Sequence, residues 1–168
     1  MAEKRHAVAD AIRVGLISDT HGVLDVRVLA AFEAAGPLAA IVHAGDIGPT
    51  PQIVWELEAL APVTAVEGNC DPHFPGLPLD IVALTTVAGV RILAVHDFTD
   101  LGPIPEGVDV VVRGHSHVPS VQQHGKVLVV NPGSASQRRR QPSRSVGILE
   151  LVEGQPPAAR IVILDEVE

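Results

Sequence analysis

Five short clusters of Asp, Asn and His residues, each directly behind an aliphatic segment, constrain the fold of this chain more than any other feature. In chain order they are SDTHG (18–22), HAGDI (43–47), GNCD (68–71), VHD (95–97) and GHSH (114–117). Short aliphatic runs are typical of buried strands, and in α/β proteins the loops at the carboxyl ends of parallel strands meet at one edge of the sheet. We therefore expect an α/β fold that brings the five clusters to one place.

The first half of the chain alternates strands with helices. Its predicted segments are strands 13–18, 39–43 and 62–66 and helices 24–35 and 50–60. Gly36-Pro37 ends the first helix, and Thr50 is predicted to cap the second, with Pro51 at its first helical position. This order of strands and helices is the pattern of a parallel sheet with crossover helices.

The second half is richer in strands. Its predicted strands are 81–87, 90–95, 108–112, 118–123, 127–130, 145–152 and 158–164. Hairpin turns are expected at Ala88-Gly89, at His124-Gly125-Lys126 and at a Gly-Gln-Pro-Pro sequence. We expect two sheets packed face to face with the helices outside, in one domain over residues 13–168, because no linker separates the halves. Residues 1–12 are expected to form a poorly ordered leader.

The composition narrows both the core and the partners. Of 168 residues, 46% are hydrophobic and 19% charged, as in a globular protein, but only 2% are aromatic, so the core must be Val, Leu, Ile and Ala. A formal net charge of -8 and the scarcity of aromatic rings disfavour a nucleic acid as a tight partner. With a single cysteine, no signal peptide and no apolar run of about 20 residues, we expect a cytoplasmic protein without a membrane partner.

Two of the clusters carry paired ligands at the same spacing. Asp19 and His21 are separated by one residue, so in extended backbone both point to the same side and can bind one cation. His115 and His117 repeat that spacing, and Gly114 allows close approach of the backbone there.

The other clusters supply the remaining ligands. Asp46 has two carboxylate oxygens and can bridge two cations, Asn69 offers a neutral oxygen, and His96 offers a nitrogen. A mixed nitrogen and oxygen set without thiolate suits Mn, Fe, Zn, Co or Ni better than Ca or Mg. Divalent ions would make the pocket electropositive in an acidic protein, which favours phosphate chemistry.

These five clusters, together with NPGS (131–134), resemble the motifs of the calcineurin-like metallophosphoesterase superfamily. The chain is most similar to the small bacterial and archaeal phosphodiesterase branch, which shares its fold with a retromer scaffold subunit. The resemblance spans residues 13 to about 136 and implies a four-layer α/β/β/α sandwich of two mixed sheets flanked by helices.

The resemblance also implies a dinuclear metal site and a reaction. One ion would be held by Asp19, His21, Asp46 and His117, and the second by Asp46, Asn69, His96 and His115. Manganese is expected, with Fe, Zn, Ni or Co as alternatives. A bridging hydroxide would attack phosphorus in line with the leaving oxygen of a small phosphoester, which makes Asp46, Asn69 and His96 the expected catalytic residues.

Two departures from the family pattern bear on the substrate. Cys70 stands where many phosphatases carry a histidine as candidate general acid, which favours good leaving groups such as aryl or nucleotide esters. Asp97 and Phe98 follow His96 where many relatives continue with Gly-His, and we do not assign Asp97 as a ligand. His43 is expected to orient Asp46 from within its strand.

Three alternatives to a phosphodiesterase stay open at this stage. A phosphomonoesterase and a nucleotide pyrophosphohydrolase would use the same site, and a protein-interaction scaffold would use the same fold. The sequence leaves open the oligomeric state, including a homo-oligomer. It also leaves open the roles of Cys70, Arg113, Arg138, Arg139 and Arg140.

Overall fold

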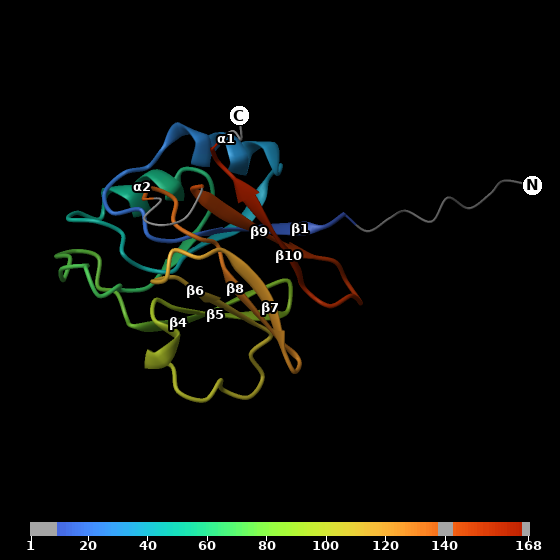
Figure 1. Ribbon diagram of the computed structural model, residues 1–168. Helices are drawn as coiled ribbons and strands as arrows, with labels where there is room; N and C mark the ends of the chain where they lie inside the picture. The colour runs from blue at the N-terminus through green and yellow to red at the C-terminus, as the bar shows by residue number, and fades with distance from the viewer. Residues whose placement is uncertain (1–9, 138–142, 166–168) are drawn as a thin grey trace, which may run out of the picture.

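The computed structural model describes residues 10–137 and 143–165, which form two five-stranded sheets stacked face to face (Figure 1). The first sheet has the order β10-β9-β1-β2-β3. Its strands are β1 (Ile12–Ile17), β2 (Leu38–His43), β3 (Val63–Ala65), β9 (Ser145–Leu151) and β10 (Ala158–Ile163). β1, β2 and β3 are parallel, as predicted, whereas β9 and β10 are antiparallel additions from the end of the chain.

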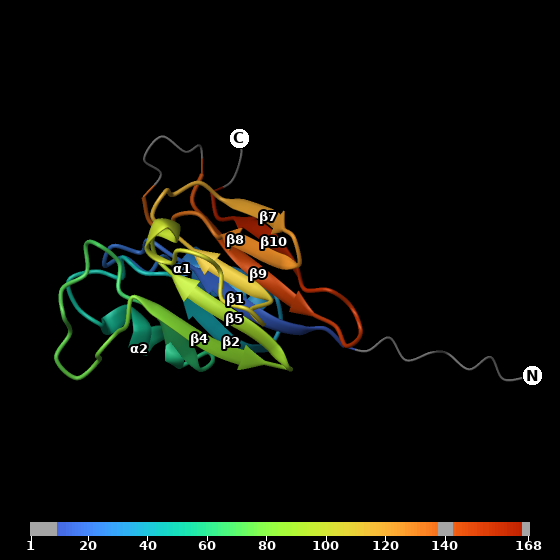
Figure 2. The same cartoon turned by 90° about the horizontal axis from the view of Figure 1, so that it is seen from below.

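The second sheet has the order β4-β5-β6-β8-β7 and lies below the first in Figure 1, and in front of it in Figure 2, which is the view from below. Its strands are β4 (Val82–Val87), β5 (Val90–Val95), β6 (Val110–Arg113), β7 (Ser120–His124) and β8 (Val127–Asn131). β5, β6 and β8 are parallel, and the outer strands join them through two antiparallel hairpins. The predicted turn at Ala88-Gly89 is confirmed, with φ of 49° and 78° at its two residues.

Two α-helices cover the outer face of the first sheet (Figure 1). They are α1 (Val26–Ala34), capped by the Asp25 side chain, and α2 (Gln52–Glu58). The prediction that Thr50 caps α2 is wrong, since Pro51 occupies the cap position and no side chain bonds to the helix end. Proline ends up one position earlier relative to the helix than predicted, because the first helical residue is Gln52.

The predicted α/β sandwich is confirmed, although its fourth layer is small. The outer face of the second sheet is covered by the 3-10 helix η1 (Phe98–Asp100) and the chain that follows it as far as Ile104. In the part of the chain that the structure describes, neither α-helix is long and apolar enough to cross a membrane. β1 begins at Ile12, one residue before the predicted strand, and the predicted leader otherwise falls mainly on residues outside the described ranges.

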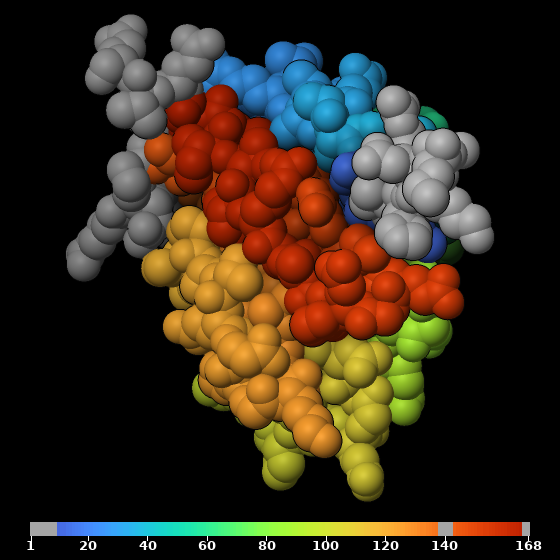
Figure 3. Space-filling view, turned by 90° about the vertical axis from the view of Figure 1, so that its right-hand side faces the viewer, coloured from blue at the N-terminus to red at the C-terminus, as the bar shows by residue number. Residues whose placement is uncertain are grey.

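The core is mainly aliphatic, as the composition predicts. It lies in three layers. The central layer, between the sheets, is formed by residues such as Leu16, Val42, Ile92, Val112 and Leu149. The layer under the helices contains Phe32, and the third underlies η1. At one side the hairpins β9–β10 and β7–β8 meet at the surface, where red and orange atoms adjoin (Figure 3). Side chains packed on both faces of the sheets hold the strands in place. The loops that follow the strands and bear the predicted ligands therefore begin at fixed positions.

Candidate metal centre

The buried carboxylate of Asp19, directly behind β1, lies at the centre of the predicted cluster. Its Oδ2 accepts hydrogen bonds from Ser18 Oγ at 2.7 Å and from the backbone N–H of His115 at 3.2 Å. Its Oδ1 accepts no hydrogen bond in the described structure. Around Oδ1 lie the Nε2 atoms of His117, His21 and His96, at 3.2, 3.8 and 4.0 Å. A buried carboxylate oxygen that lacks a hydrogen bond and faces three imidazole nitrogens fits a site for a cation.

Asp46, behind β2, lies between the two halves of the cluster. Its Oδ1 accepts the backbone N–H of Cys70 at 2.9 Å, and its Oδ2 lies 3.3 Å from His96 Nε2 and 3.7 Å from His21 Nε2. Burial alone raises the pKa of Asp46, but His96, the Cys70 N–H and His21 outweigh it and hold this pKa well below its usual value. The carboxylate therefore stays anionic at the point where the predicted bridging ligand belongs.

Asn69, His96 and His115 form the second half of the cluster. Asn69 Oδ1 lies 3.0 Å from His96 Nε2 and 3.2 Å from His115 Nδ1, and the two imidazole rings are 5.2 Å apart. His96 Nδ1 bonds to the carbonyl of Ala44 at 2.8 Å, which leaves Nε2 to face the carboxylates. Burial lowers the pKa of His96, but Asp46 and Asp19 raise it above its usual value overall, so this spot favours positive charge.

Three groups of side chains within the described residues have ligand atoms that all lie within 4.8 Å of one another. They are Asp19, His21 and His117; Asp19, Asp46 and His96; and His21, Asp46 and Cys70. With Asn69 and His115 beside His96, all seven predicted ligands lie together. The donor set fits a divalent transition metal, because it combines imidazole nitrogens with carboxylate and amide oxygens.

The ligands sit on unusual backbone. Six non-glycine residues in the described structure have positive φ, and five of them are predicted ligands: Asp19 (56°), His21 (45°), Asp46 (55°), His115 (71°) and His117 (62°). The left-handed region costs energy for residues with a Cβ, and such residues gather at functional sites. The expectation that Asp19 and His21 converge through extended backbone is therefore wrong, although both do reach one group. His115 and His117 diverge, the first toward Asn69 and the second toward Asp19.

The loop after β8 holds Asp19 in this conformation. Ser134 Oγ and Ser136 Oγ both donate to the Asp19 carbonyl, at 3.1 and 2.8 Å, and the N–H of Ala135 donates to the carbonyl of Ser18 at 3.1 Å. The sequence singled out NPGS (131–134) as a motif, but the hydrogen bonds of these two serines were not predicted from it. The alternation of Ser134 and Ser136 behind a Pro-Gly turn was the available signal.

Asn131 performs the same task for the GHSH cluster. Its Nδ2 donates to the carbonyl of Gly114 at 3.1 Å and to Ser116 Oγ at 3.0 Å, while its Oδ1 accepts the N–H of Gly133 at 2.9 Å. The amide thus ties the end of β8 to the loop that presents His115 and His117.

His43, fully buried at the end of β2, orients the segment that carries Asp46. Its Nδ1 accepts the N–H of Gly45 at 3.1 Å, so Nε2 carries the proton and donates to Thr20 Oγ1 at 3.0 Å. The Thr20 hydroxyl in turn donates to the carbonyl of Ile47 at 2.8 Å. Burial, followed by the charge of His96, lowers the pKa of His43 to about 3. The neutral ring therefore fixes the loop on both sides of Asp46.

Asp71 ties two of the loops together. Its Oδ1 accepts the N–H groups of Ile47 and Gly48 at 2.7 and 3.1 Å, and its Oδ2 accepts the N–H of Gly68 at 2.9 Å. Burial raises the pKa of Asp71 above its usual value, although these backbone hydrogen bonds oppose the rise. The loop with Asp46 and the loop with Asn69 thus share one carboxylate.

Two glycines allow the loops to close on the carboxylates. A Cβ on Gly68 would collide with the backbone N and Oδ1 of Asp46, and one on Gly114 would collide with Ser18 Oγ and approach Asp19 Oδ2. These clashes confirm the expectation that the backbone at Gly114 makes a close approach.

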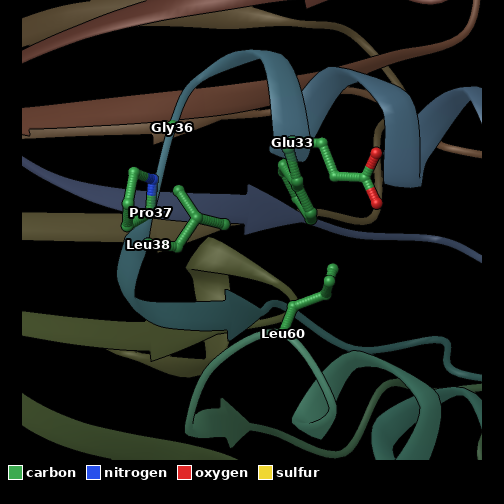
Figure 4. Close-up of a pocket in the computed structure, with 6 residues that line it drawn as sticks. Glu33, Gly36, Pro37, Leu38 and Leu60 are labelled. Carbon is green, nitrogen blue, oxygen red and sulfur yellow. The ribbon is translucent and has the colours of Figure 1, made fainter.

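A hollow of about 430 Å³ adjoins the cluster, lined by His21, Gly48, Pro49, Cys70, Asp71 and Pro72. A second pocket, of about 280 Å³, lies between the end of α1 and Leu60 and contains no predicted ligand (Figure 4). Of these two cavities, only the hollow beside Cys70 is lined by a predicted ligand, His21.

Two sets of arginines had open roles. The Arg113 guanidinium lies over the Phe98 ring, 5.3 Å from its centroid. Arg138, Arg139 and Arg140 lie outside the described residues.

Comparison with known proteins matches the part of the chain that contains the seven predicted ligands. The family model of the calcineurin-like phosphoesterase superfamily domain matches residues 12–154. A probable metallophosphoesterase of Methanothermobacter thermautotrophicus is 34% identical over 133 residues, which cover 72% of this chain and 76% of that protein. The phosphodiesterase YfcE of Escherichia coli is 30% identical over 156 residues, with 79% of this chain and 84% of YfcE covered.

Solved structures share the fold. The structure of YfcE, described as a phosphoesterase, has a TM-score of 0.65 at 26% identity and covers 92% of this chain and 100% of its own. Vacuolar protein sorting 29 from Cryptosporidium parvum has a TM-score of 0.69 at 17% identity, with 91% and 97% covered. The second likeness concerns the fold alone.

Proposed function

We infer that this chain, which belongs to the calcineurin-like phosphoesterase superfamily, is a phosphodiesterase that works with two divalent metal ions. Membership makes it a phosphoesterase, and thus a hydrolase; the phosphodiester bond and the two ions are our proposal. The observation that carries it is Asp19 Oδ1, a buried carboxylate oxygen without a hydrogen bond in the described structure and surrounded by the Nε2 atoms of three histidines.

The side chains divide into two sets that share Asp46. We assign Asp19, His21, Asp46 and His117 to one ion, and Asp46, Asn69, His96 and His115 to the other. When bound, a pair of divalent ions supplies Lewis acidity toward the phosphoryl oxygens and makes a water molecule a nucleophile near neutral pH. We propose Mn²⁺ for both positions, with Fe, Zn, Ni and Co as alternatives for this donor set.

The protein's own residues contribute orientation and charge. His96 and the hydrogen bond from the Cys70 N–H keep Asp46 anionic, and the neutral ring of His43 keeps the flanking loop in place. Two carboxylates, Asp19 and Asp46, belong to the proposed centre, so two divalent metal ions would leave it with the net positive charge that an anionic phosphodiester requires.

Cys70 bears on the bond that is cleaved. Its exposed side chain lies at the hollow beside His21, and its Sγ belongs to the group with His21 and Asp46. A thiol is a weaker hydrogen-bond donor than an imidazolium, so it gives a departing alkoxide little help. The site is therefore best suited to small phosphodiesters with good leaving groups, such as aryl or nucleotide esters.

The alternative functions differ from a phosphodiesterase in the bond that is cleaved or in having no catalytic activity. A phosphomonoesterase or nucleotide pyrophosphohydrolase would use the same ligands, whereas a scaffold has no need of seven intact ligands at one centre. Location in the cytoplasm and assembly into a homo-oligomer stay predictions from the sequence.

The test is a comparison of two chromogenic substrates under identical Mn²⁺ concentrations. We expect kcat/KM for bis(p-nitrophenyl) phosphate to exceed that for p-nitrophenyl phosphate. The reverse order would show a phosphomonoesterase. Tight Mn²⁺ binding without turnover of either ester, or of a dinucleoside polyphosphate, would favour the scaffold.

A further inference from the structure

His115 differs from the other histidines of the centre in how it is held. The side chains of His96 and His117 are each only 2% exposed, and that of His21 is 14% exposed, whereas the side chain of His115 is 48% exposed. Packing therefore fixes the first three rings but not the fourth. Some other contact must set the orientation of His115 if its ring is to stay in place.

The two ring nitrogens of His115 face different groups. Nδ1 lies 3.2 Å from Asn69 Oδ1, on the side of the predicted ligands, and Nε2 lies 3.8 Å from Asp97 Oδ2. His96 shows the matching arrangement, with Nε2 toward the ligands and Nδ1 on the carbonyl of Ala44. Metal-binding histidines generally use their second nitrogen in this way, on a carboxylate or a carbonyl.

Asp97 is itself held in place. Its Oδ1 accepts the N–H of Thr99 at 3.0 Å and the Thr99 hydroxyl at 2.8 Å, so that it caps η1. Phe98, the next residue, packs in the third core layer and carries the Arg113 guanidinium over its ring. Because β6 ends at Arg113, two residues before His115, η1 is fixed to the same strand end that presents His115. Oδ1 is used by the cap, and Oδ2 remains for the imidazole.

We propose that Asp97 is a positioning residue that orients His115 through its Nε2 and so directs Nδ1 toward the second metal ion. The proposal rests on the proposed function, since it needs an ion beside Asn69 and His96. It assigns a role to a residue that the sequence set apart only as a departure from the family pattern. Loss of such a carboxylate partner typically costs about 10–100-fold in metal affinity.

Asp97→Asn is the sharpest variant, because the asparagine oxygen still accepts from Thr99 and caps η1, while an amide N–H₂ replaces the anionic Oδ2. Asp100→Asn is the matched control. It removes the same charge from the same short helix at an exposed residue that is not in contact with His115. Both chelator-stripped variants and the wild type would be titrated with Mn²⁺ by calorimetry, and the spin-coupled Mn²⁺ pair would be followed by electron paramagnetic resonance.

We expect the affinity of one Mn²⁺ site to fall by about 10–100-fold in Asp97→Asn while the other is unchanged. At two equivalents of Mn²⁺, the coupled-pair signal should weaken in favour of the mononuclear signal, and Asp100→Asn should match the wild type. Equal affinities in Asp97→Asn and wild type, or equal weakening of both sites, would overturn the proposal alone. A wild type that binds fewer than two Mn²⁺ would overturn the proposed function and this proposal with it.

Discussion

At the level of single residues, the candidate centre consists of polar side chains, most of them on backbone in the left-handed region that non-glycine residues rarely adopt. Asp19 and Asp46 both have positive φ, and both accept backbone N–H groups on one carboxylate oxygen while the other faces imidazole nitrogens. This division leaves one oxygen of each carboxylate directed into the centre. The strain is compensated by hydrogen bonds from loops that are distant in sequence.

Asp46→Asn tests the shared position of this carboxylate. The substitution keeps the shape of the side chain but removes the charge between the two sets of ligands. We expect the affinity of both Mn²⁺ sites to fall. Turnover should drop by more than 100-fold, because loss of a residue that only orients a metal ligand typically costs about 10–100-fold. Calorimetry and hydrolysis of bis(p-nitrophenyl) phosphate measure the two effects. Near-normal turnover with two bound ions would remove Asp46 from its bridging role, and Asp100→Asn serves as the control of equal charge.

His43 predicts a pH dependence of stability. Its pKa is about 3 in the folded chain against 6.5 ordinarily, so between these values the unfolded chain binds the additional proton. The free energy of unfolding should therefore fall as the pH decreases from about 6.5 toward 3, by up to about 1.4 kcal/mol per pH unit from this group.

Urea unfolding of the chelator-stripped protein at several pH values checks this dependence. His43→Gln should show a shallower decline than wild type. His73→Gln, at a side chain that is 95% exposed, should keep the wild-type slope. Identical slopes in all three proteins would show that His43 does not stay neutral in the folded state.

At the level of elements, the centre is a set of loops that are bound to one another as well as to their strands. Asp71 joins the loop after β2 to the loop after β3, and the loop after β8 bonds to the backbone of Ser18 and Asp19 behind β1. Each loop therefore depends on a second one for its conformation. A change in one carboxylate between loops should reach ligands that it does not touch.

Asp71→Asn should lower the free energy of unfolding by about 1–3 kcal/mol, because its amide N–H₂ would face a backbone N–H that then lacks an acceptor. Mn²⁺ affinity should fall in the same variant, since the loops with Asp46 and Asn69 lose their common partner. Asp80→Asn, at an exposed residue, is the control. Urea unfolding and calorimetry would measure both quantities; a variant as stable as the control would contradict this role of Asp71.

The sequence predicted these elements well where a local signal exists. Aliphatic runs located the strands, and the polar residues directly behind them located the ligands. The left-handed backbone of Asp19 had no such signal, because the serines that bond to its carbonyl lie more than a hundred residues away in the sequence. The N-cap of α2 was predicted one residue too early, at Thr50 instead of Pro51. The local sequence does not decide between these two neighbours, because the start of the helix depends on the path of the preceding loop.

At the level of the whole molecule, the two sheets act as one rigid frame. Aliphatic side chains from both sheets fill the layer between them, and the loops that bear the ligands come from both sheets. Asp19, Asp46 and Asn69 follow strands of the first sheet, whereas His96, His115 and His117 follow strands of the second. The centre thus lies where the loops of the first sheet meet the loops of the second. Two sheets packed face to face were predicted, but the 3-10 helix η1 as the element of the fourth layer was not, because a single 3-10 turn leaves no helical periodicity.

Hydrolysis of bis(p-nitrophenyl) phosphate by chelator-stripped protein, with Mn²⁺ added back in steps, is the decisive measurement for a two-metal phosphodiesterase. We predict no turnover in the stripped protein and a rise that saturates at two equivalents of bound Mn²⁺. Turnover that is indifferent to chelation, or a protein that binds no divalent metal ion, would contradict it.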